Sequence, residues 1–302
     1  MHVAVMGAGS LGSLIGGLLA TTHRVTLVGR EPHMRAIASE GLHLSGAVDR
    51  TVHPATTTSW SALDAVDVAL VTVKSYDTLA AATAMRANPP SVVISLQNGL
   101  DTTTPLRDGI GHRPEILAGT ATYGALLEEP GHVQCTGQGT IVFGKPDGGR
   151  SSSAEQLAAS WGEAVDCRAT TAMPQRRWEK VATNAGINPI TALSGVRNGR
   201  VLDDPLWPIA TAATREVTRV ARSRGHDLEE HETVARLKTV AQQTAENESS
   251  MARDVRTGSQ TEIDAITGAV LTRAAQSVVP VNRVLYGLIA GYEMGAGIRD
   301  SS

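Results

Sequence analysis

The chain has 302 residues, of which 41% are hydrophobic and 19% charged, and its formal net charge is −3. This composition is typical of folded globular proteins and excludes disordered, collagen-like and coiled-coil chains, and the length favours two domains. The lack of a basic excess and the 3% aromatic content argue against nucleic acid as a partner.

The first half of the chain alternates short Val, Ala and Leu runs with helical stretches and glycines, which is the pattern of βαβ units. Two runs, 68–73 and 92–94, are apolar without alternation, so we expect strands that are buried on both faces, as in a parallel sheet covered by helices. The predicted strands are 2–6, 24–28, 67–73, 91–96, 116–119 and 140–143.

A glycine-rich loop directly follows the first predicted strand and leads into an apolar helix at 14–20. This is the setting of the G-x-G-x-x-G fingerprint, whose glycines permit a tight turn, close approach of the backbone to a pyrophosphate, and packing of the helix on the strand. A plain glycine-rich turn is the alternative. The predicted dinucleotide site consists of Gly7, Ala8, Gly9, Ser10, Leu11 and Gly12.

The residues after the second strand favour NADP over NAD. An NAD site carries Asp or Glu there for the ribose 2′-hydroxyl, whereas this chain has Gly29-Arg30. A guanidinium pairs with a 2′-phosphate, so Arg30 predicts NADPH/NADP as the cofactor. Lys74 follows the 67–73 strand, at the edge where open α/β sheets bind ligands, and is a second cofactor candidate. For either residue the alternative is a solvated surface cation.

The second half of the chain is predicted to be helical, with helices at 177–193, 205–224, 231–246, 262–277 and 281–294. Gly225 marks the C-terminal end of the second of these helices. We therefore predict an α/β protein in which an N-terminal Rossmann-type doubly wound sheet, residues 1–168, precedes an all-helical C-terminal domain, residues 169–302, for substrate and catalysis. Apolar surface on the C-terminal helices is compatible with a homodimer.

Three polar residues, Lys180, Asn184 and Asn188, recur at i, i+4 and i+8 of the first of these helices. This spacing puts them on one helical face, where a buried polar group needs a partner. Pro189 removes a backbone hydrogen bond and is expected to kink the helix. We interpret this polar stripe as a functional site; the alternative for Asn188 is a cap ahead of Pro189.

The two cysteines, Cys135 and Cys167, lie far apart and predict neither a zinc site nor a disulfide framework, so we expect no metal. The chain opens with a strand-like run rather than a signal peptide, and no apolar run approaches the roughly 18 to 20 residues of a membrane span. We expect a cytoplasmic protein with no membrane partner.

Several motifs occur in the order and approximate spacing of the 2-dehydropantoate 2-reductases, or ketopantoate reductases, and the chain resembles that family from its N-terminus to about Gly291. The resemblance rests on the glycine loop, Lys74, Gln97-Asn98-Gly99, residues 180–193, Glu246-Asn247-Glu248-Ser249-Ser250-Met251 and Thr261-Glu262-Ile263-Asp264. It implies NADPH-dependent reduction of 2-dehydropantoate to (R)-pantoate in pantothenate synthesis. It also implies a general acid at Lys180, an acidic partner at Glu262, a cofactor contact at Asn98, and substrate contacts at Asn184, Asn188, Asn247 and Ser250.

The chemistry of these residues agrees with the implied roles. Hydride transfer to a ketone leaves negative charge on the oxygen, and a protonated amine such as that of Lys180 can stabilise the charge and supply a proton. Simpler alternatives remain open: an ordinary Asn-Gly turn for Asn98, a first-turn helix charge for Glu262, and helix caps for Asn247 and Ser250.

Two departures from the family pattern concern Asp101, where many relatives carry Gly, and Tyr123, near a position where many carry His. Asp101 is expected to cap the following helix, and Tyr123 to alter the pocket wall. The resemblance implies a keto acid as the small-molecule partner. Two rival functions remain: reduction of a different 2-keto acid, or non-catalytic NADP(H) binding by a sensor.

Overall fold

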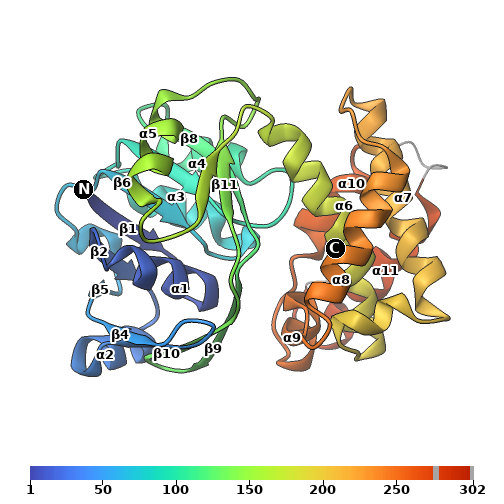
Figure 1. Ribbon diagram of the computed structural model, residues 1–302, viewed down its shortest axis with the longest axis horizontal. Coiled ribbons are helices and arrows are strands. Elements are labelled where there is room, and N and C mark those ends of the chain that lie inside the picture. The colour runs from blue at the N-terminus through green and yellow to red at the C-terminus, as the bar shows by residue number, and fades with distance from the viewer. Residues whose placement is uncertain (275–278, 300–302) are drawn as a thin grey trace. The chain divides into compact units, whose positions relative to one another are not determined.

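The computed structural model describes residues 1–274 and 279–299. The chain divides into two compact units, here called unit 1 (Met1–Gln97 and Thr102–Met173) and unit 2 (Asn98–Asp101 and Pro174–Ser302) (Figure 1). The short segment 98–101 thus belongs to the helical unit, although the residues on both sides of it belong to the sheet unit. Among the described helices, none combines the length and the apolar character that crossing a membrane requires.

Unit 1 is built on an eight-stranded sheet with the order β12-β11-β8-β7-β6-β1-β2-β5. All neighbouring strands are parallel except β8 and β11, which are antiparallel. The six predicted strands are all present. The strands are β1 (His2–Met6), β2 (Arg24–Val28), β5 (Ala55–Thr57), β6 (Val68–Val71), β7 (Val92–Ser95), β8 (Glu115–Ala121), β11 (Ile141–Gly144) and β12 (Cys167–Ala169).

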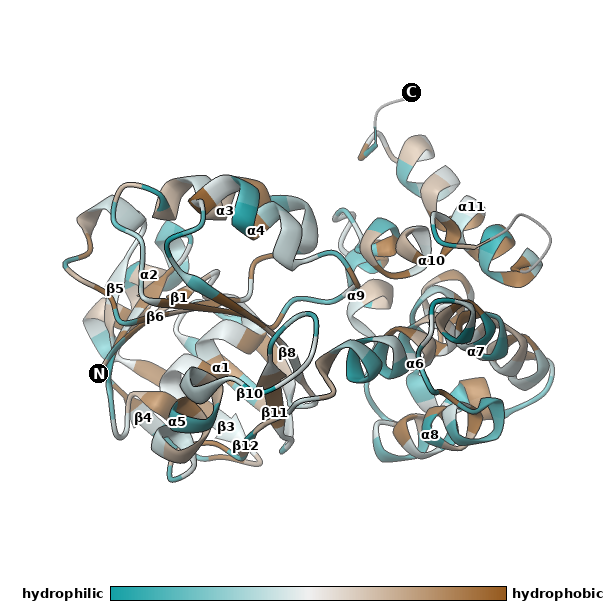
Figure 2. Cartoon of the chain, turned by 90° about the horizontal axis from the view of Figure 1, so that it is seen from above, coloured by the Kyte–Doolittle hydropathy of each residue, from teal (hydrophilic) through white to brown (hydrophobic). Residues whose placement is uncertain are grey.

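Helices cover both faces of this sheet, as the unbroken apolar runs predicted. In Figure 2, α3 (Thr78–Met85) and α4 (Thr103–Ile110) lie on one side of β1 and β6, and α1 (Ser10–Leu19) and α5 (Ser152–Trp161) on the other. Neighbouring residues of β6 belong to different cores: Leu70 to the cluster containing Leu14, and Val71 to the cluster containing Met85. The central strands are therefore buried on both faces.

A second, four-stranded sheet in unit 1 has the order β4-β3-β10-β9. Its strands are β3 (Leu42–Gly46), β4 (Arg50–Val52), β9 (Gly124–Glu129) and β10 (His132–Gly137). These segments mix glycine, histidine and polar residues, so the sequence gives little sign of them. The remaining helical segments of unit 1 are α2 (Glu31–Glu40), η1 (Trp60–Ala62) and η2 (Ser75–Asp77).

Unit 2 is helical, as predicted. Its elements are α6 (Met173–Ser194), η3 (Asn198–Leu202), α7 (Leu206–Ser223), α8 (Glu230–Gln243), α9 (Ser250–Arg256), the π-helical turn η4 (Asp264–Gly268), α10 (Ala269–Leu271) and α11 (Pro280–Gly295). The predicted helix 262–277 begins instead with the π-helical turn, and its last predicted residues, 275–277, lie outside the described residues. Gly225 takes φ +85° just after α7, as expected for a residue that ends a helix.

A buried carboxylate joins two helices of unit 2. Glu216 on α7 is 4% exposed, and it accepts hydrogen bonds from the backbone N–H groups of Val281 and Asn282 (both 2.9 Å) and from Asn282 Nδ2 (2.8 Å). The first N–H groups of a helix have no partner within it, so Glu216 satisfies the donors that open α11.

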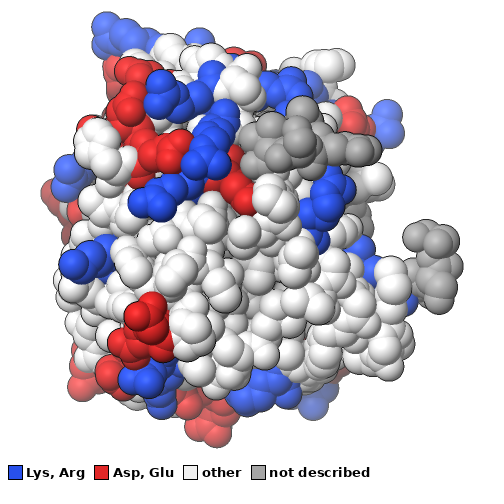
Figure 3. Space-filling model, turned by 90° about the vertical axis from the view of Figure 1, so that its right-hand side faces the viewer, with Lys and Arg blue, Asp and Glu red and all other residues white. Residues whose placement is uncertain are grey.

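The outer side of α11 is apolar. Val284, Leu288 and Tyr292 are exposed and recur at i, i+4 and i+8. Figure 3 shows one face of the molecule with a wide uncharged area in its middle and charged side chains around its edges.

Candidate active site

The three glycines of the loop after β1 have two different roles. Gly7 takes φ +102°, and a Cβ there would lie 2.5 Å from Val73 N; a Cβ on Gly12 would lie 2.4 Å from Thr72 Oγ1. A Cβ on Gly9 would meet nothing within 4 Å. Gly7 and Gly12 are therefore required by packing within unit 1, whereas the space beside Gly9 is open to a ligand.

The N-terminus of α1 presents backbone donors at this loop. The first intrahelical bond runs from Ser13 N to Gly9 O at 2.9 Å, so the N–H groups of residues 10–12 precede the helical ladder. Such groups, with the helix dipole, favour an anion. Ala8 is buried and Leu11 packs against the core, so these two contribute backbone and packing.

Two side chains of α1 attach the small sheet to this helix. Ser10 Oγ accepts from Leu127 N (3.0 Å), and Ser13 Oγ contacts His33 Nε2 (2.9 Å). His33 Nδ1 accepts from Gly131 N (2.9 Å), which requires a neutral ring, and burial lowers the His33 pKa. Sequence reasoning missed His33 because its partners lie 20 and 98 residues away.

Arg30 and Lys74 follow the carboxyl ends of β2 and β6. Arg30 is exposed at the N-cap of α2, and its guanidinium forms no hydrogen bond or ion pair with any described residue. Lys74 is half-buried ahead of η2. Its loop is held by buried Gln97, whose Nε2 donates to Val73 O (3.0 Å) and to Thr78 Oγ1 (2.7 Å), a role the sequence did not reveal.

In unit 2, Lys180, Glu262 and Asn98 form one polar cluster. Burial lowers the pKa of the Lys180 ammonium to about 8, and the negative charge of Glu262 acts in the opposite direction. Glu262 is 6% exposed, and its Oε2 accepts from Asn98 Nδ2 at 2.9 Å. The buried Glu262 carboxylate thus has a hydrogen-bond partner, which the alternative of a first-turn helix charge does not account for.

The segment 98–101 is firmly bound to unit 2. Gly99 takes φ +104°, and a Cβ there would lie 2.5 Å from Ala265 O. Leu100 belongs to the unit 2 core, and Asp101 pairs with Arg273. The N-cap of α4 is Thr102, so the expectation that Asp101 caps that helix is wrong.

A second buried carboxylate fixes the residue before Glu262. Glu293 on α11 is fully buried, and its Oε1 accepts from Thr261 N (2.8 Å) and Thr261 Oγ1 (2.7 Å). Its Oε2 pairs with Arg299 at 2.8 Å. No sequence motif indicated Glu293, which is 32 residues from its partner.

The four predicted substrate residues have side chains whose polar groups are not hydrogen-bonded within the described part of the chain. Asn188 is 7% exposed, Asn184 and Asn247 are half-buried, and Ser250 is exposed. The side chain of each makes no hydrogen bond with a residue that the structure describes. α6 continues through Pro189 to Ser194, so Asn188 is no cap.

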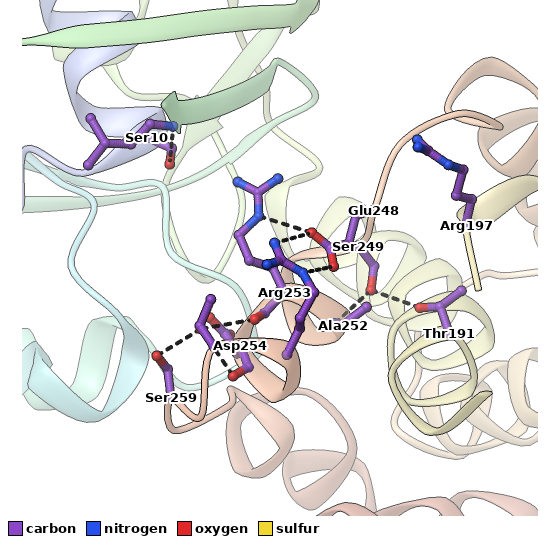
Figure 4. A network of polar contacts seen from close by, with 12 residues as sticks. Ser10, Thr191, Arg197, Glu248, Ser249, Ala252, Arg253, Asp254 and Ser259 are labelled. Carbon is purple, nitrogen blue, oxygen red and sulfur yellow. Dashed lines mark hydrogen bonds and ion pairs between the residues drawn. The ribbon is translucent and has the colours of Figure 1, made fainter. Parts of the chain in front are cut away.

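The helix cap at the end of the Glu246–Met251 motif is Ser249. It is the N-cap of α9 and accepts from Ala252 N at 3.0 Å, while its Oγ lies 2.8 Å from Thr191 Oγ1 on α6. Figure 4 shows Ser249 joining Thr191 and Ala252 in this way. The capping alternatives for Asn247 and Ser250 are therefore wrong, and both polar groups remain available to a ligand.

The remaining candidates lie in unit 1. Cys135 and Cys167 are free thiols, and among the described residues no group of three or more His, Cys, Asp or Glu side chains could hold a metal ion. Tyr123 packs against the unit 1 core, and its hydroxyl accepts from Asp166 N at 3.2 Å.

Comparisons with known proteins bear on both units. Residues 3–148 match the family model described as "Ketopantoate reductase PanE/ApbA", and residues 172–293 match its C-terminal counterpart. A 2-dehydropantoate 2-reductase of Halobacterium salinarum is 38% identical over 300 residues, covering 96% of this chain and 98% of its own. One from Archaeoglobus fulgidus is 36% identical over 299 residues, covering 97% and 98%.

Solved structures give the same result. The PanE/ApbA family ketopantoate reductase of Ralstonia eutropha has a TM-score of 0.89 and 30% identity, covering 98% of this chain and 100% of its own. D-mandelate dehydrogenase, solved with NADH and anilino(oxo)acetate, has a TM-score of 0.91 at 20% identity, over 98% and 100% of the two chains, which shows a shared fold. Matches over both units and nearly the whole length show that the chain belongs to the ketopantoate reductase family of oxidoreductases.

Proposed function

We propose that this enzyme reduces the 2-keto group of 2-dehydropantoate to (R)-pantoate with NADPH, in the synthesis of pantothenate. The observation that carries the proposal is Lys180: a half-buried ammonium whose pKa is lowered to about 8 by desolvation, and which interacts with a buried Glu262 that accepts a hydrogen bond from Asn98. A pKa near the working pH is what a general acid needs.

Several groups of unit 1 support NADPH as the cofactor of this proposal. The open space at Gly9 and the N–H groups at residues 10–12 suit a pyrophosphate. The guanidinium of Arg30 is exposed and pairs with none of the residues that the structure describes, which suits a 2′-phosphate. Lys74, at the same edge of the sheet, is a further candidate for the ribose or phosphates. When bound, this cofactor supplies the hydride.

Lys180 supports the other half of the reaction. Its ammonium donates a hydrogen bond to the keto oxygen, stabilises the negative charge that develops there, and transfers the proton. Glu262 keeps part of the ammonium population charged, and Asn98 holds Glu262 in place. The substrate's remaining polar groups are bound by four side chains that have no hydrogen-bond partner among the described residues: Asn184, Asn188, Asn247 and Ser250.

The first test is oxidation of NADPH by the purified protein with ketopantoate, pyruvate and 2-ketoisovalerate, and with NADH in place of NADPH. We expect oxidation with NADPH and ketopantoate. Turnover of a different keto acid would contradict the proposed substrate and leave the proposed mechanism standing. NADPH binding without turnover of any keto acid would favour a sensor.

The role of Lys180 is tested by Lys180→Ala. We expect turnover to fall roughly 100- to 10,000-fold, the usual range for a general acid, while NADPH still binds. Near-normal turnover would remove Lys180 from the reaction.

The role of Arg30 is tested by Arg30→Ala. Loss of the guanidinium should weaken NADPH binding selectively, because NADH has no 2′-phosphate. Equal losses for both nucleotides, measured by titration of nucleotide fluorescence, would contradict the assignment.

A further inference from the structure

Arg253 lies close to the predicted substrate residues of unit 2. It stands three residues after Ser250 on α9, so the two share a helical face. The start of α9 is fixed to α6 by the contact between Ser249 and Thr191, and Thr191 Oγ1 also lies 3.1 Å from the backbone oxygen of Asn188. The start of α9, one turn before Arg253, is therefore held against the turn of α6 that carries Asn188.

Glu248 orients Arg253 without using its terminal nitrogens. The Oε2 of Glu248 lies 3.4 Å from Arg253 Nε (Figure 4). Arg253 makes no other side-chain hydrogen bond or ion pair with a described residue, and its side chain is 29% exposed. A guanidinium anchored only through Nε keeps both terminal N–H₂ groups for a ligand.

Arg256 shares the same carboxylate in a different way. It donates from Nε (2.8 Å) and from Nη2 (3.0 Å) to Glu248, and its side chain is 63% exposed. Arg256, and after it Arg253, holds the pKa of Glu248 below its usual value. One carboxylate thus faces two guanidinium groups, and the uncompensated positive charge remains on Arg253.

This arrangement suits a carboxylate ligand. The two terminal nitrogens of a guanidinium match the two oxygens of a carboxylate, and an anchored side chain loses less freedom on binding. Lys180 and Asn188 are eight residues apart, about 12 Å along α6, which is within the combined reach of extended Lys and Arg side chains. A 2-keto acid carries its carboxylate next to the ketone that Lys180 would protonate.

We propose that Arg253, oriented by Glu248, binds the carboxylate of the 2-keto acid and so determines the preference for acids over neutral ketones. This inference rests on the proposed function. Under this proposal the substrate is bound by a charged side chain, that of Arg253, in addition to the hydroxyl of Ser250.

The test compares Arg253→Gln with Arg256→Gln, two variants that each remove one partner of Glu248. For Arg253→Gln we expect the KM for ketopantoate to rise roughly 10- to 100-fold, the usual effect of losing a charge-assisted hydrogen bond, with kcat retained. Arg256→Gln should keep the KM near the wild-type value. Arg253→Lys, which keeps the charge and loses the paired geometry, should be intermediate.

A neutral substrate separates recognition of the carboxylate from general damage. The methyl ester of the keto acid should have the same KM with the wild-type protein and with Arg253→Gln. The dissociation constant of NADPH should also be unchanged; if it rises instead of the KM for ketopantoate, the guanidinium binds a cofactor phosphate and the inference is overturned. Thermal unfolding of all three variants controls for folding.

The outcomes distinguish this inference from the function on which it rests. Absence of turnover by the wild-type protein would overturn the proposed function. Active wild-type protein with an unchanged KM in Arg253→Gln would overturn the role of Arg253 alone.

Discussion

The charge of Lys180 is set by two opposing influences, burial and the carboxylate of Glu262, with burial the larger. If the protonated amine is the acid, kcat for reduction should fall as the pH rises through about 8, because the ammonium is then lost. Glu262→Gln removes the negative charge that raises the pKa of Lys180, so the same decline should begin at a lower pH. The pH profile of kcat for both proteins measures this shift.

Lys180→Arg provides the control, because a guanidinium stays protonated across this range. Its residual activity should lack the decline near pH 8. A decline at an unchanged pH in all three proteins would assign it to a group other than Lys180.

The stripe of Lys180, Asn184 and Asn188 could be predicted from the sequence because its members share one helix and obey its period. The bond between Asn98 and Glu262 could not, since 164 residues separate the two. Glu293 and His33 likewise act on partners distant in the chain, and local spacing carries no information about such pairs.

On the scale of single elements, the helix that follows the glycine loop can be probed by two matched substitutions. Gly12→Ala puts a Cβ 2.4 Å from Thr72 Oγ1, and should cost about 1–3 kcal/mol of unfolding free energy because α1 must move from the sheet. Gly9→Ala meets no protein atom within 4 Å, so it should leave stability unchanged and weaken NADPH binding. Chemical unfolding without cofactor and NADPH titration separate the two effects.

Loss of stability in Gly9→Ala, or unchanged stability in Gly12→Ala, would contradict these separate roles. Both substitutions add the same methyl group within one turn of α1, so any difference between the two variants reflects the surroundings of that methyl group.

Elements with strong local signals were predicted, and those that depend on distant partners were not. Unbroken apolar runs identified β6 and β7, since strands buried on both faces need no polar side. The three-residue strands β5 and β12 form only as partners of the longer strands β2 and β11. In the small sheet, β3 pairs with β10, which is distant from it in the sequence. The π-helical turn at Asp264–Gly268 lies beside Gly99, a contact that helical periodicity does not encode.

On the scale of the whole molecule, the segment 98–101 makes unit 2 depend on residues that lie within the sequence of unit 1. Gly99→Ala should displace this segment from Ala265 and separate Asn98 from Glu262, so kcat should fall although Gly99 makes no contact through a side chain. Gly111→Ala is the matched control, with φ +90° but nothing within 4 Å of the added Cβ. Gly111→Ala should lower the stability through backbone strain and leave kcat unchanged. Similar kcat values for Gly99→Ala and Gly111→Ala would contradict the prediction.

The same segment limits how this protein can be recombined. A crossover placed at residue 173 would transfer the helices of unit 2 and leave the four residues Asn98–Asp101 with the other parent. The helical unit is therefore encoded by two separate segments of the gene. Exchange of catalytic units between relatives requires two inserts, or parents that already agree at these four positions.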